Sequence, residues 1–206
     1  MDKKTPLNKV KNMDRKKSLK RKTSIGLFNQ IIQLHNELDE AFLSQFSRSL
    51  PFNEELLDRW KRAEKLGFGK ETSIYDSSLV FGEVEVGTNC WIGPFTIIDG
   101  SGGLTIGNYC TISAGVHIYT HDNVKHTLSS GKIPIERQPV VIGNNTYIAP
   151  YAIITKGISI GNNCIIGANS LVNKDVPDNS IVFGQPAKIK GEVIIENGNV
   201  EFSYYK

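Results

Sequence analysis

A hydrophobic residue recurs at every sixth position over most of this sequence, and this period restricts the fold more than any other feature does. The aliphatic positions are Ile74, Val80, Val86, Ile92, Ile98, Ile106, Ile112, Ile118, Ile142, Ile148, Ile154, Ile160, Ile166 and Val172. An α-helix repeats about every 3.6 residues and a half-buried strand every two, so neither produces a period of six. A coil with three flat faces does, because each six-residue unit supplies one short strand and one corner.

A second position of the repeat supports the same fold. The fourth residue after each aliphatic position is small or β-branched in nearly every repeat, and glycine often follows the aliphatic residue directly, as at Gly87 and Gly107. Glycine at a bend permits a positive φ. The phase slips by two residues at 101–103 and then resumes. We therefore expect a mainly β protein, a parallel β-helix of about five coils between Ile74 and Ile181 with a continuous aliphatic core.

The first 72 residues lack this period and divide into a basic tail and a helical region. Residues 1–24 contain ten Lys or Arg and two Asp, a formal charge of +8, whereas the rest of the chain carries −5. Such a run is typical of a flexible, solvated tail, with contact to an anionic membrane or polymer as the functional alternative. Residues 25–72 are expected to be helical. Apolar residues recur every three or four positions over 25–47, and a second helix is predicted from Asn53, its N-cap, to Gly67.

Composition sets limits on the class of protein. Hydrophobic residues make up 39% of the chain and charged residues 22%, which is ordinary for a soluble globular protein. We find neither an apolar run of the ~20 residues that span a bilayer nor a secretory signal, so a cytoplasmic location is expected. Cys90, Cys110 and Cys164 occupy the same inward repeat position, which predicts buried thiols rather than disulfides or metal ligands. The acidic balance of the folded part, without a recognition motif, argues against nucleic-acid binding.

The repeat pattern is interrupted once. Between Ile118 and Ile142 the in-phase positions would include Ser130 and Glu136, which cannot line a hydrophobic core. Residues 119–139 must therefore leave the coil as an excursion, and long excursions from a rigid scaffold often carry function. The histidines in or beside it are His117, His121 and His126. The β-helix domain is expected over residues 73–191, followed over 192–206 by a hairpin, turning at Asn197-Gly198, that caps the end of the coil.

The stretch from Ile92 to Lys190 resembles the hexapeptide-repeat acetyltransferases, which include maltose, galactoside and xenobiotic O-acetyltransferases and enzymes of surface-polysaccharide pathways. The residues that carry the resemblance are IDGSGGLTIGNYCTISAGVHIYTHD and PVVIGNNTYIAPYAIITKGISIGNNCIIGANSLVNKDVPDNSIVFGQPAKIKG. The resemblance implies a left-handed coil, acetyl-CoA as acyl donor, and a homotrimer with sites shared between subunits. It also implies a small-molecule acceptor, a sugar or nucleotide-linked sugar of surface-polysaccharide synthesis, and leaves O- or N-acetylation open.

Catalytic roles follow from the same resemblance. In that family the histidine of the protruding loop is the general base that deprotonates the acceptor, and the matching residue is His121. An imidazole titrates near neutrality and can both take and return a proton, so the residue type suits the role. Asp122, its neighbour, and Asp99, on the preceding coil, are alternative partners for its imidazole. His117 is interpreted as a surface residue and His126 as a residue that shapes the excursion.

The resemblance also implies the residues that bind acetyl-CoA. They are Ala149, Ala168, Asn173, Lys174 and Lys188. Small side chains would admit the pantetheine arm, and the lysines would face the anionic nucleotide end. Relatives donate a backbone N–H to the thioester oxygen at the position of Pro150. Proline has no N–H, so either a neighbouring amide replaces it or the oxyanion is stabilised less here.

Two other classes of protein share this repeat. A metalloenzyme similar to the γ-class carbonic anhydrases would need histidines on neighbouring coils to hold a metal, and the sequence supplies only His121 and His126, both in the excursion. The other class is a structural β-helix without catalysis, in which a histidine at position 121 would have no purpose. A transferase that uses acyl carrier protein is a further variant of the enzyme hypothesis. No metal is expected to be required.

Overall fold

The computed structural model describes residues 19 and 21–205, so the basic tail predicted over 1–24 lies almost entirely outside the described residues. The chain forms two compact units, the first ending at Leu56 and the second beginning at Leu57. Within the described residues, no helix combines the length and the apolarity that crossing a bilayer requires.

The first unit contains the helices α1 (Lys22–Phe46) and α2 (Phe52–Leu56). The helix predicted from residue 25 therefore begins three residues earlier. It ends where Ser47 adopts a left-handed conformation. The short α2 packs against α1: the rings of His35 and Phe52 lie 5.1 Å apart.

The single helix predicted from Asn53 to Gly67 is wrong, because the chain breaks at Leu57 and restarts as α3 (Arg59–Lys65). Asp58 causes the restart. Its carboxylate accepts hydrogen bonds from the amides of Trp60 and Lys61, both at 2.9 Å, and thereby caps the new helix.

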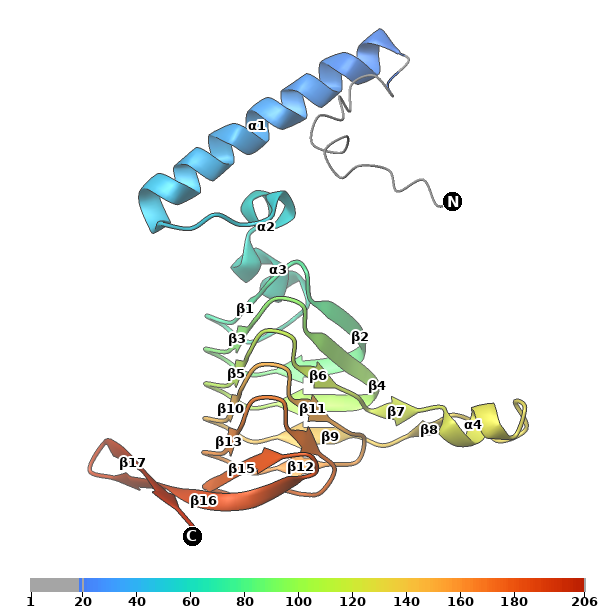
Figure 1. Ribbon diagram of the computed structural model, residues 1–206, viewed down its shortest axis with the longest axis vertical. Helices are drawn as coiled ribbons and strands as arrows, with labels where there is room; N and C mark the ends of the chain where they lie inside the picture. Colours follow the sequence, from blue (N-terminus) through green and yellow to red (C-terminus); the bar gives the residue numbers. More distant parts are fainter. Residues whose placement is uncertain (1–18, 20, 206) are drawn as a thin grey trace, which may run out of the picture. The chain divides into compact units, whose positions relative to one another are not determined.

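In the second unit, α3 covers the first coil of the β-helix (Figure 1). The side chain of Ala63, a residue of α3, is fully buried in the core that this helix covers. The Arg62 guanidinium donates hydrogen bonds to the carbonyl of Tyr75 and, at 2.7 Å, to that of Ser78. The helix therefore closes the apolar column at its N-terminal end and satisfies carbonyl groups of the first coil.

The rest of the second unit is a parallel β-helix, as predicted. The strands of its first face are β1 (Ser73–Ile74), β3 (Trp91–Ile92), β5 (Thr111–Ile112), β10 (Tyr147–Ile148), β13 (Ile165–Ile166) and β15 (Ser180–Gly184). These six strands pair in parallel in that order, so the coil has about six turns rather than the five expected.

The other two faces join into one sheet, because the long strands β2 (Leu79–Val86) and β4 (Ile97–Ile106) run around the corner between them. The second face continues through β6 (His117–Ile118), β11 (Ile153–Ile154) and β14 (Leu171–Val172). The third face continues through β9 (Val140–Ile142) and β12 (Ser159–Ile160).

The predicted aliphatic column forms the core. All of the in-phase positions are buried except Val80, which packs against the core while partly exposed. Identical or similar residues stack from coil to coil, as Ile98 does on Ile118. Burying one such side chain contributes roughly 1.5–3 kcal/mol, so the column is the main source of stability. The three cysteines are buried and unbridged, as predicted.

The two-residue slip has a structural cause. It lies in β4, where the register of β2 against β4 shifts between Gly82 and Val84. The extra residues widen the corner between the second and third faces. They include Gly102, where a Cβ would come within 2.4 Å of the Thr120 carbonyl oxygen, so the close approach requires glycine.

A hairpin with the predicted turn follows the coil, but it begins at Ala187, five residues before the expected boundary at 192. Strand β16 (Ala187–Glu196) pairs antiparallel with β15 and with β17 (Asn199–Tyr204). Asn197 and Gly198 form its turn with φ values of 52° and 80°. Type I′ turns need positive φ at both central residues, and Asn-Gly tolerates this conformation, which explains why the sequence predicted a turn here.

Candidate active site

The excursion predicted over residues 119–139 projects sideways from the stack of coils (Figure 1). Its neck is a two-stranded ribbon of β7 (His121–Asp122) and β8 (Glu136–Arg137), and its tip carries the short helix α4 (Val124–Leu128). His121 therefore lies at the point where the chain leaves the coil.

Thr120 anchors this neck to the preceding coil. It is fully buried, and its hydroxyl accepts a hydrogen bond from the Gly102 amide at 2.8 Å. Its carbonyl accepts one from the Gln138 amide at 2.9 Å, which ties the two ends of the excursion together. Its own amide donates to Asp99 Oδ2 at 2.9 Å. The residue before His121 is therefore held on three sides.

Asp99 is the partner of the His121 imidazole. Its Oδ2 lies 2.7 Å from His121 Nδ1. The Asp99 side chain is only 2% exposed, whereas that of His121 is 38% exposed. One end of the imidazole therefore meets a buried carboxylate while the ring itself stays open to solvent.

The surroundings of Asp99 keep it ionised. Burial raises its pKa, but hydrogen bonds from the Ser101 hydroxyl, from the amides of Thr120 and Ser101 and from His121 outweigh burial and lower the pKa from 3.8 to about 2. The Ser101 hydroxyl donates to Oδ1 at 2.5 Å. An ionised carboxylate can only accept, so His121 Nδ1 must carry the proton. In the neutral ring, Nε2 then holds the free lone pair.

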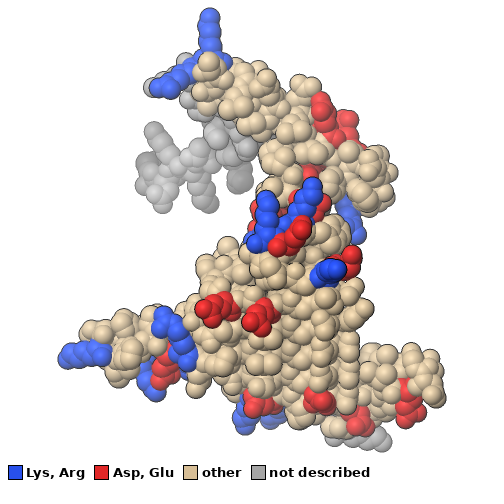
Figure 2. Space-filling model, turned by 180° about the vertical axis from the view of Figure 1, so that it is seen from behind, with Lys and Arg blue, Asp and Glu red and all other residues tan. Residues whose placement is uncertain are grey.

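Asp122, the other candidate partner, faces a different group. Its Oδ2 forms an ion pair of 2.7 Å with Lys156 Nζ, and its Oδ1 accepts from the Val124 amide. Lys156 Nζ also lies 3.1 Å from Glu136 Oε2. Figure 2 shows acidic and basic side chains side by side on the protruding excursion. Of the two alternative partners of the imidazole, Asp99 is therefore the one in contact with it, and Asp122 pairs with Lys156 instead.

The other two histidines of this region, His117 on β6 of the coil and His126 in the excursion, make different contacts. His117 Nδ1 is 3.3 Å from the Tyr119 hydroxyl, and their rings meet edge to face. His126 Nδ1 is 2.8 Å from the Ile133 carbonyl oxygen, a bond that closes the tip of the excursion.

A cleft of about 320 Å³ opens beside His121. It is lined by Tyr119, His121, Asp122, Asn123, Thr155 and Lys156. Each of these residues carries a hydroxyl, imidazole, amide or charged group, although most of the area that faces the cleft is apolar. Such a cleft suits a small molecule that offers both hydrogen-bonding groups and carbon surface.

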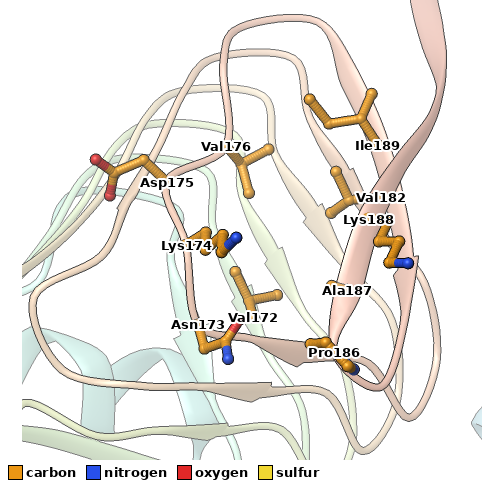
Figure 3. Close-up of a pocket in the computed structure, with 10 residues that line it drawn as sticks. All are labelled: Val172, Asn173, Lys174, Asp175, Val176, Val182, Pro186, Ala187, Lys188 and Ile189. Atoms are coloured by element: carbon orange, nitrogen blue, oxygen red, sulfur yellow. The ribbon is translucent and has the colours of Figure 1, made fainter.

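A second cleft, of about 340 Å³, follows along the same corner of the coil. It contains three of the five residues predicted for acetyl-CoA: Asn173, Lys174 and Lys188. Figure 3 shows their side chains around apolar groups of β14, β15 and β16, with the Asp175 carboxylate pointing away. The Thr155 amide donates to the Val172 carbonyl at 3.0 Å, so the two clefts are adjacent.

The other two predicted residues lie at a different corner. Ala149 is buried after β10 and Ala168 is exposed after β13, and neither lines either cleft. The amides on either side of Pro150 are already bonded, because Ala149 N donates to the Ile166 carbonyl and Tyr151 N to that of Ala114. This corner therefore supplies no free donor at residues 149–151.

Among residues 19 and 21–205, no group of three or more His, Cys, Asp or Glu side chains is arranged to hold a metal ion. Of the two histidines that the carbonic-anhydrase hypothesis offers, His121 contacts Asp99 and His126 contacts the excursion backbone.

Comparison with known proteins identifies the family. The family "Bacterial transferase hexapeptide (six repeats)" matches residues 139–174. Galactoside O-acetyltransferase of Escherichia coli is 31% identical, in an alignment that covers 59% of this chain and 70% of that protein. The chain belongs to the hexapeptide-repeat transferases. It is an acyltransferase of that family.

Other members differ in the substrates that their names give. A serine acetyltransferase of Staphylococcus aureus is 38% identical over 57% of this chain and 53% of its own. The solved structure of NeuO, an acetyltransferase specific for polySia, is 26% identical with a TM-score of 0.51, over 59% of this chain and 58% of that one. The hexapeptide-repeat transferase described here thus spans little more than half the length of these two proteins.

The same fold occurs in a variant of AntD, an N-acyltransferase from Bacillus cereus solved with dTDP and coenzyme A. The identity is 21% and the TM-score 0.53, over 63% of this chain and 86% of that one.

Sequence reasoning missed three residues of this acyltransferase's candidate site. Ser101 and Thr120 hold Asp99, and Lys156 holds Asp122 and Glu136. A signal for them existed in the repeat, since Ile118 stacks between Ile98 and Ile154. Residues that follow these positions meet at one corner, which brings 99–101, 119–121 and 155–156 together.

Proposed function

We propose that this protein transfers an acetyl group from acetyl-CoA to a hydroxyl group of a sugar or nucleotide-linked sugar, with His121 as general base. The observation that carries the proposal is the contact between His121 Nδ1 and the buried, ionised Asp99 at the edge of an open cleft. It fixes the tautomer in which Nε2 is the basic nitrogen.

The chemistry follows from this tautomer. Nε2 removes the proton from the acceptor hydroxyl as its oxygen attacks the thioester carbonyl carbon, and the imidazolium then returns a proton to the departing thiolate sulfur. Asp99 stays ionised, holds the ring by its Nδ1–H and stabilises the imidazolium. Asp99 is therefore a positioning residue, whereas His121 is the catalytic residue.

The second cleft supports acetyl-CoA as the donor. Its apolar lining suits a slender pantetheine arm, and Lys174 and Lys188 suit the anionic nucleotide end. Acetyl-CoA supplies an activated acyl group with a thiolate leaving group. The oxyanion that forms during attack needs a hydrogen-bond donor, which we propose comes from a residue other than Pro150.

The acceptor class is inferred from the lining of the first cleft and from the relatives. Tyr119, Asn123 and Thr155 offer the aromatic, amide and hydroxyl groups that recognise polyols. The E. coli relative is named for galactosides and NeuO for polySia. Together with the resemblance of the sequence, this supports an acceptor that belongs to surface-polysaccharide synthesis.

A trimer would unite the groups that one chain keeps apart. His121 lies at one edge of the face formed by β6, β11 and β14, while Ala149 and Ala168 lie at the opposite edge. Large apolar side chains are exposed on this face, including Leu79 and Ile153. We propose that neighbouring copies pack through it, so that the alanines of one copy border the acetyl-CoA used by His121 of the next.

The test is an assay of free thiol release from acetyl-CoA against a panel of sugars, amino sugars, nucleotide sugars and serine. The proposal predicts release that depends on a sugar hydroxyl. Release with serine alone would overturn the acceptor class. An absence of release with every acceptor, together with no binding of acetyl-CoA, would overturn the transferase and favour a structural β-helix.

A further inference from the structure

The neck of the excursion carries two carboxylates that face each other. Asp122 on β7 and Glu136 on β8 are paired residues of the antiparallel ribbon. Like charges directly opposite each other across such a ribbon repel, and this ribbon has only two residues in each strand to hold it together. Without a cation between these carboxylates, the neck would tend to open.

Lys156 supplies that cation from another coil. Its Nζ lies 2.7 Å from Asp122 Oδ2 and 3.1 Å from Glu136 Oε2, and its side chain is only 18% exposed. Lys125 also reaches Glu136, at 2.5 Å, but its side chain is 62% exposed and lies within the excursion itself. Among these contacts, Lys156 is therefore the one that joins both strands of the neck to the rigid coil.

The electrostatics agree with this geometry. Hydrogen bonds with Asp122 and then with Glu136 raise the pKa of Lys156. The pKa of Asp122 is lowered chiefly by Lys156, and that of Glu136 by Lys125 and then by Lys156. All three groups stay charged at neutral pH, so the clamp is permanent under ordinary conditions.

His121 lies between this clamp and the anchor on the preceding coil. Thr120 is tied to Asp99 and Gly102 on one side, and Asp122 is tied to Lys156 on the other. The coil that carries Lys156 is itself fixed by the pairing of Ile118 with Ile154. The imidazole is therefore held by the residues before and after it, from two different coils.

We propose that Lys156 is a positioning residue for the proposed transfer reaction, clamping the excursion so that His121 Nε2 stays aimed at the cleft. This inference rests on the proposed function. Lys156 also lines the cleft, but its ammonium group already contacts two carboxylates. Its effect is therefore expected on kcat rather than on the KM of the acceptor.

The experiment compares Lys156→Met with the wild type and with Lys132→Met. Lys132 is an exposed lysine of the same excursion and serves as the matched control. A displaced base loses alignment, so we expect kcat to fall about 10- to 100-fold in Lys156→Met with little change in KM. The control is expected to retain the wild-type kcat.

A rescue variant separates positioning from general damage. Adding Asp122→Asn and Glu136→Gln to Lys156→Met removes the repulsion, because neutral amides can face each other, and kcat should recover to within about threefold of the wild type. Unchanged kcat in Lys156→Met, or no recovery in the triple variant, would overturn the inference.

Hydrogen exchange tests the clamp independently of catalysis. Amides of residues 121–137 should exchange about tenfold faster in Lys156→Met, while those of the coil remain as in the wild type. If the wild type transfers no acetyl group but this difference is found, the clamp stands and the proposed function fails. Equal exchange in the two proteins would overturn the clamp.

Discussion

The carboxylate of Asp99 receives hydrogen bonds from Ser101, Thr120 and His121, and this number of donors explains why one residue both orders the corner and orients the base. An amide at this position has one acceptor oxygen where the carboxylate has two, and its NH₂ group faces donors. The substitution Asp99→Asn therefore tests the role of the buried charge at constant size.

We expect Asp99→Asn to lower kcat at least about 100-fold, because the imidazole loses the acceptor that fixes its tautomer. Steady-state rates of thiol release at saturating acceptor measure this effect. Substitution of the half-buried neighbour Asp122 by Asn, which removes an ion pair but not the contact between Asp99 and His121, should lower kcat less. A larger loss in Asp122→Asn than in Asp99→Asn would contradict the assignment.

The lowered pKa of Asp99 also predicts a dependence of stability on pH. The pKa falls from 3.8 to about 2 on folding, which corresponds to about 2 kcal/mol. Because the folded value is the lower one, this contribution is fully present above about pH 4 and is lost as the pH falls towards 2.

Urea unfolding of the wild type and of Asp99→Asn across this range checks the prediction. The difference between their free energies of unfolding should shrink as the pH falls from 4 to 2. A difference that stays constant over the same interval would mean that the Asp99 charge does not stabilise the fold.

The strands of the coil stabilise the protein through the side chains that point into the core. In β9, Ile142 is 1% exposed and points into the core, whereas the adjacent Val141 is 45% exposed and points outward. Backbone pairing is the same for both residues, so this pair isolates the contribution of core packing.

We expect Ile142→Ala to lower the free energy of unfolding by about 2–5 kcal/mol, because it leaves a cavity in the stacked column. Val141→Ala, the control on the same strand, should change it by no more than about 0.5 kcal/mol. Chemical denaturation measures both values. Similar losses in the two variants would show that the outer face of β9 is also packed.

The elements differ in how far the sequence predicted them. The period of six predicted the coil because the aliphatic position recurs in phase and is buried in nearly every repeat, and Asn197-Gly198 predicted the hairpin turn through its backbone preference. The break at Asp58 was missed, because an aspartate inside an amphipathic pattern reads as a polar position until its contact with the Trp60 amide is seen.

The site was predictable in part for the same reason. The interruption of the repeat, which is a signal along the chain, pointed to His117, His121 and His126, and the resemblance to the hexapeptide-repeat acetyltransferases selected His121. The sequence could not decide between Asp99 and Asp122 as the partner of the imidazole. That choice depends on which coil approaches the imidazole and on the ion pair between Asp122 and Lys156. Which residues of neighbouring coils lie side by side depends on how the coils stack, and the two-residue slip in β4 shifts that register.

At the scale of the whole molecule, the separation of His121 from Ala149 and Ala168 predicts assembly. Sedimentation equilibrium should give the mass of three copies of the 22.8 kDa chain. The exposed apolar face would then be covered, so Ile153→Glu should shift the mass towards that of one chain. A monomer with full activity would contradict the shared site.

The central claim is that His121 is the base of an acetyl transfer, and the most direct measurement is acceptor-dependent thiol release by His121→Ala beside the wild type. General bases contribute about 10²- to 10⁴-fold, so kcat should fall by that factor while the binding of acetyl-CoA persists. The control His126→Ala, which alters only the tip of the excursion, should stay active. Release by His121→Ala at a rate close to that of the wild type would contradict the account.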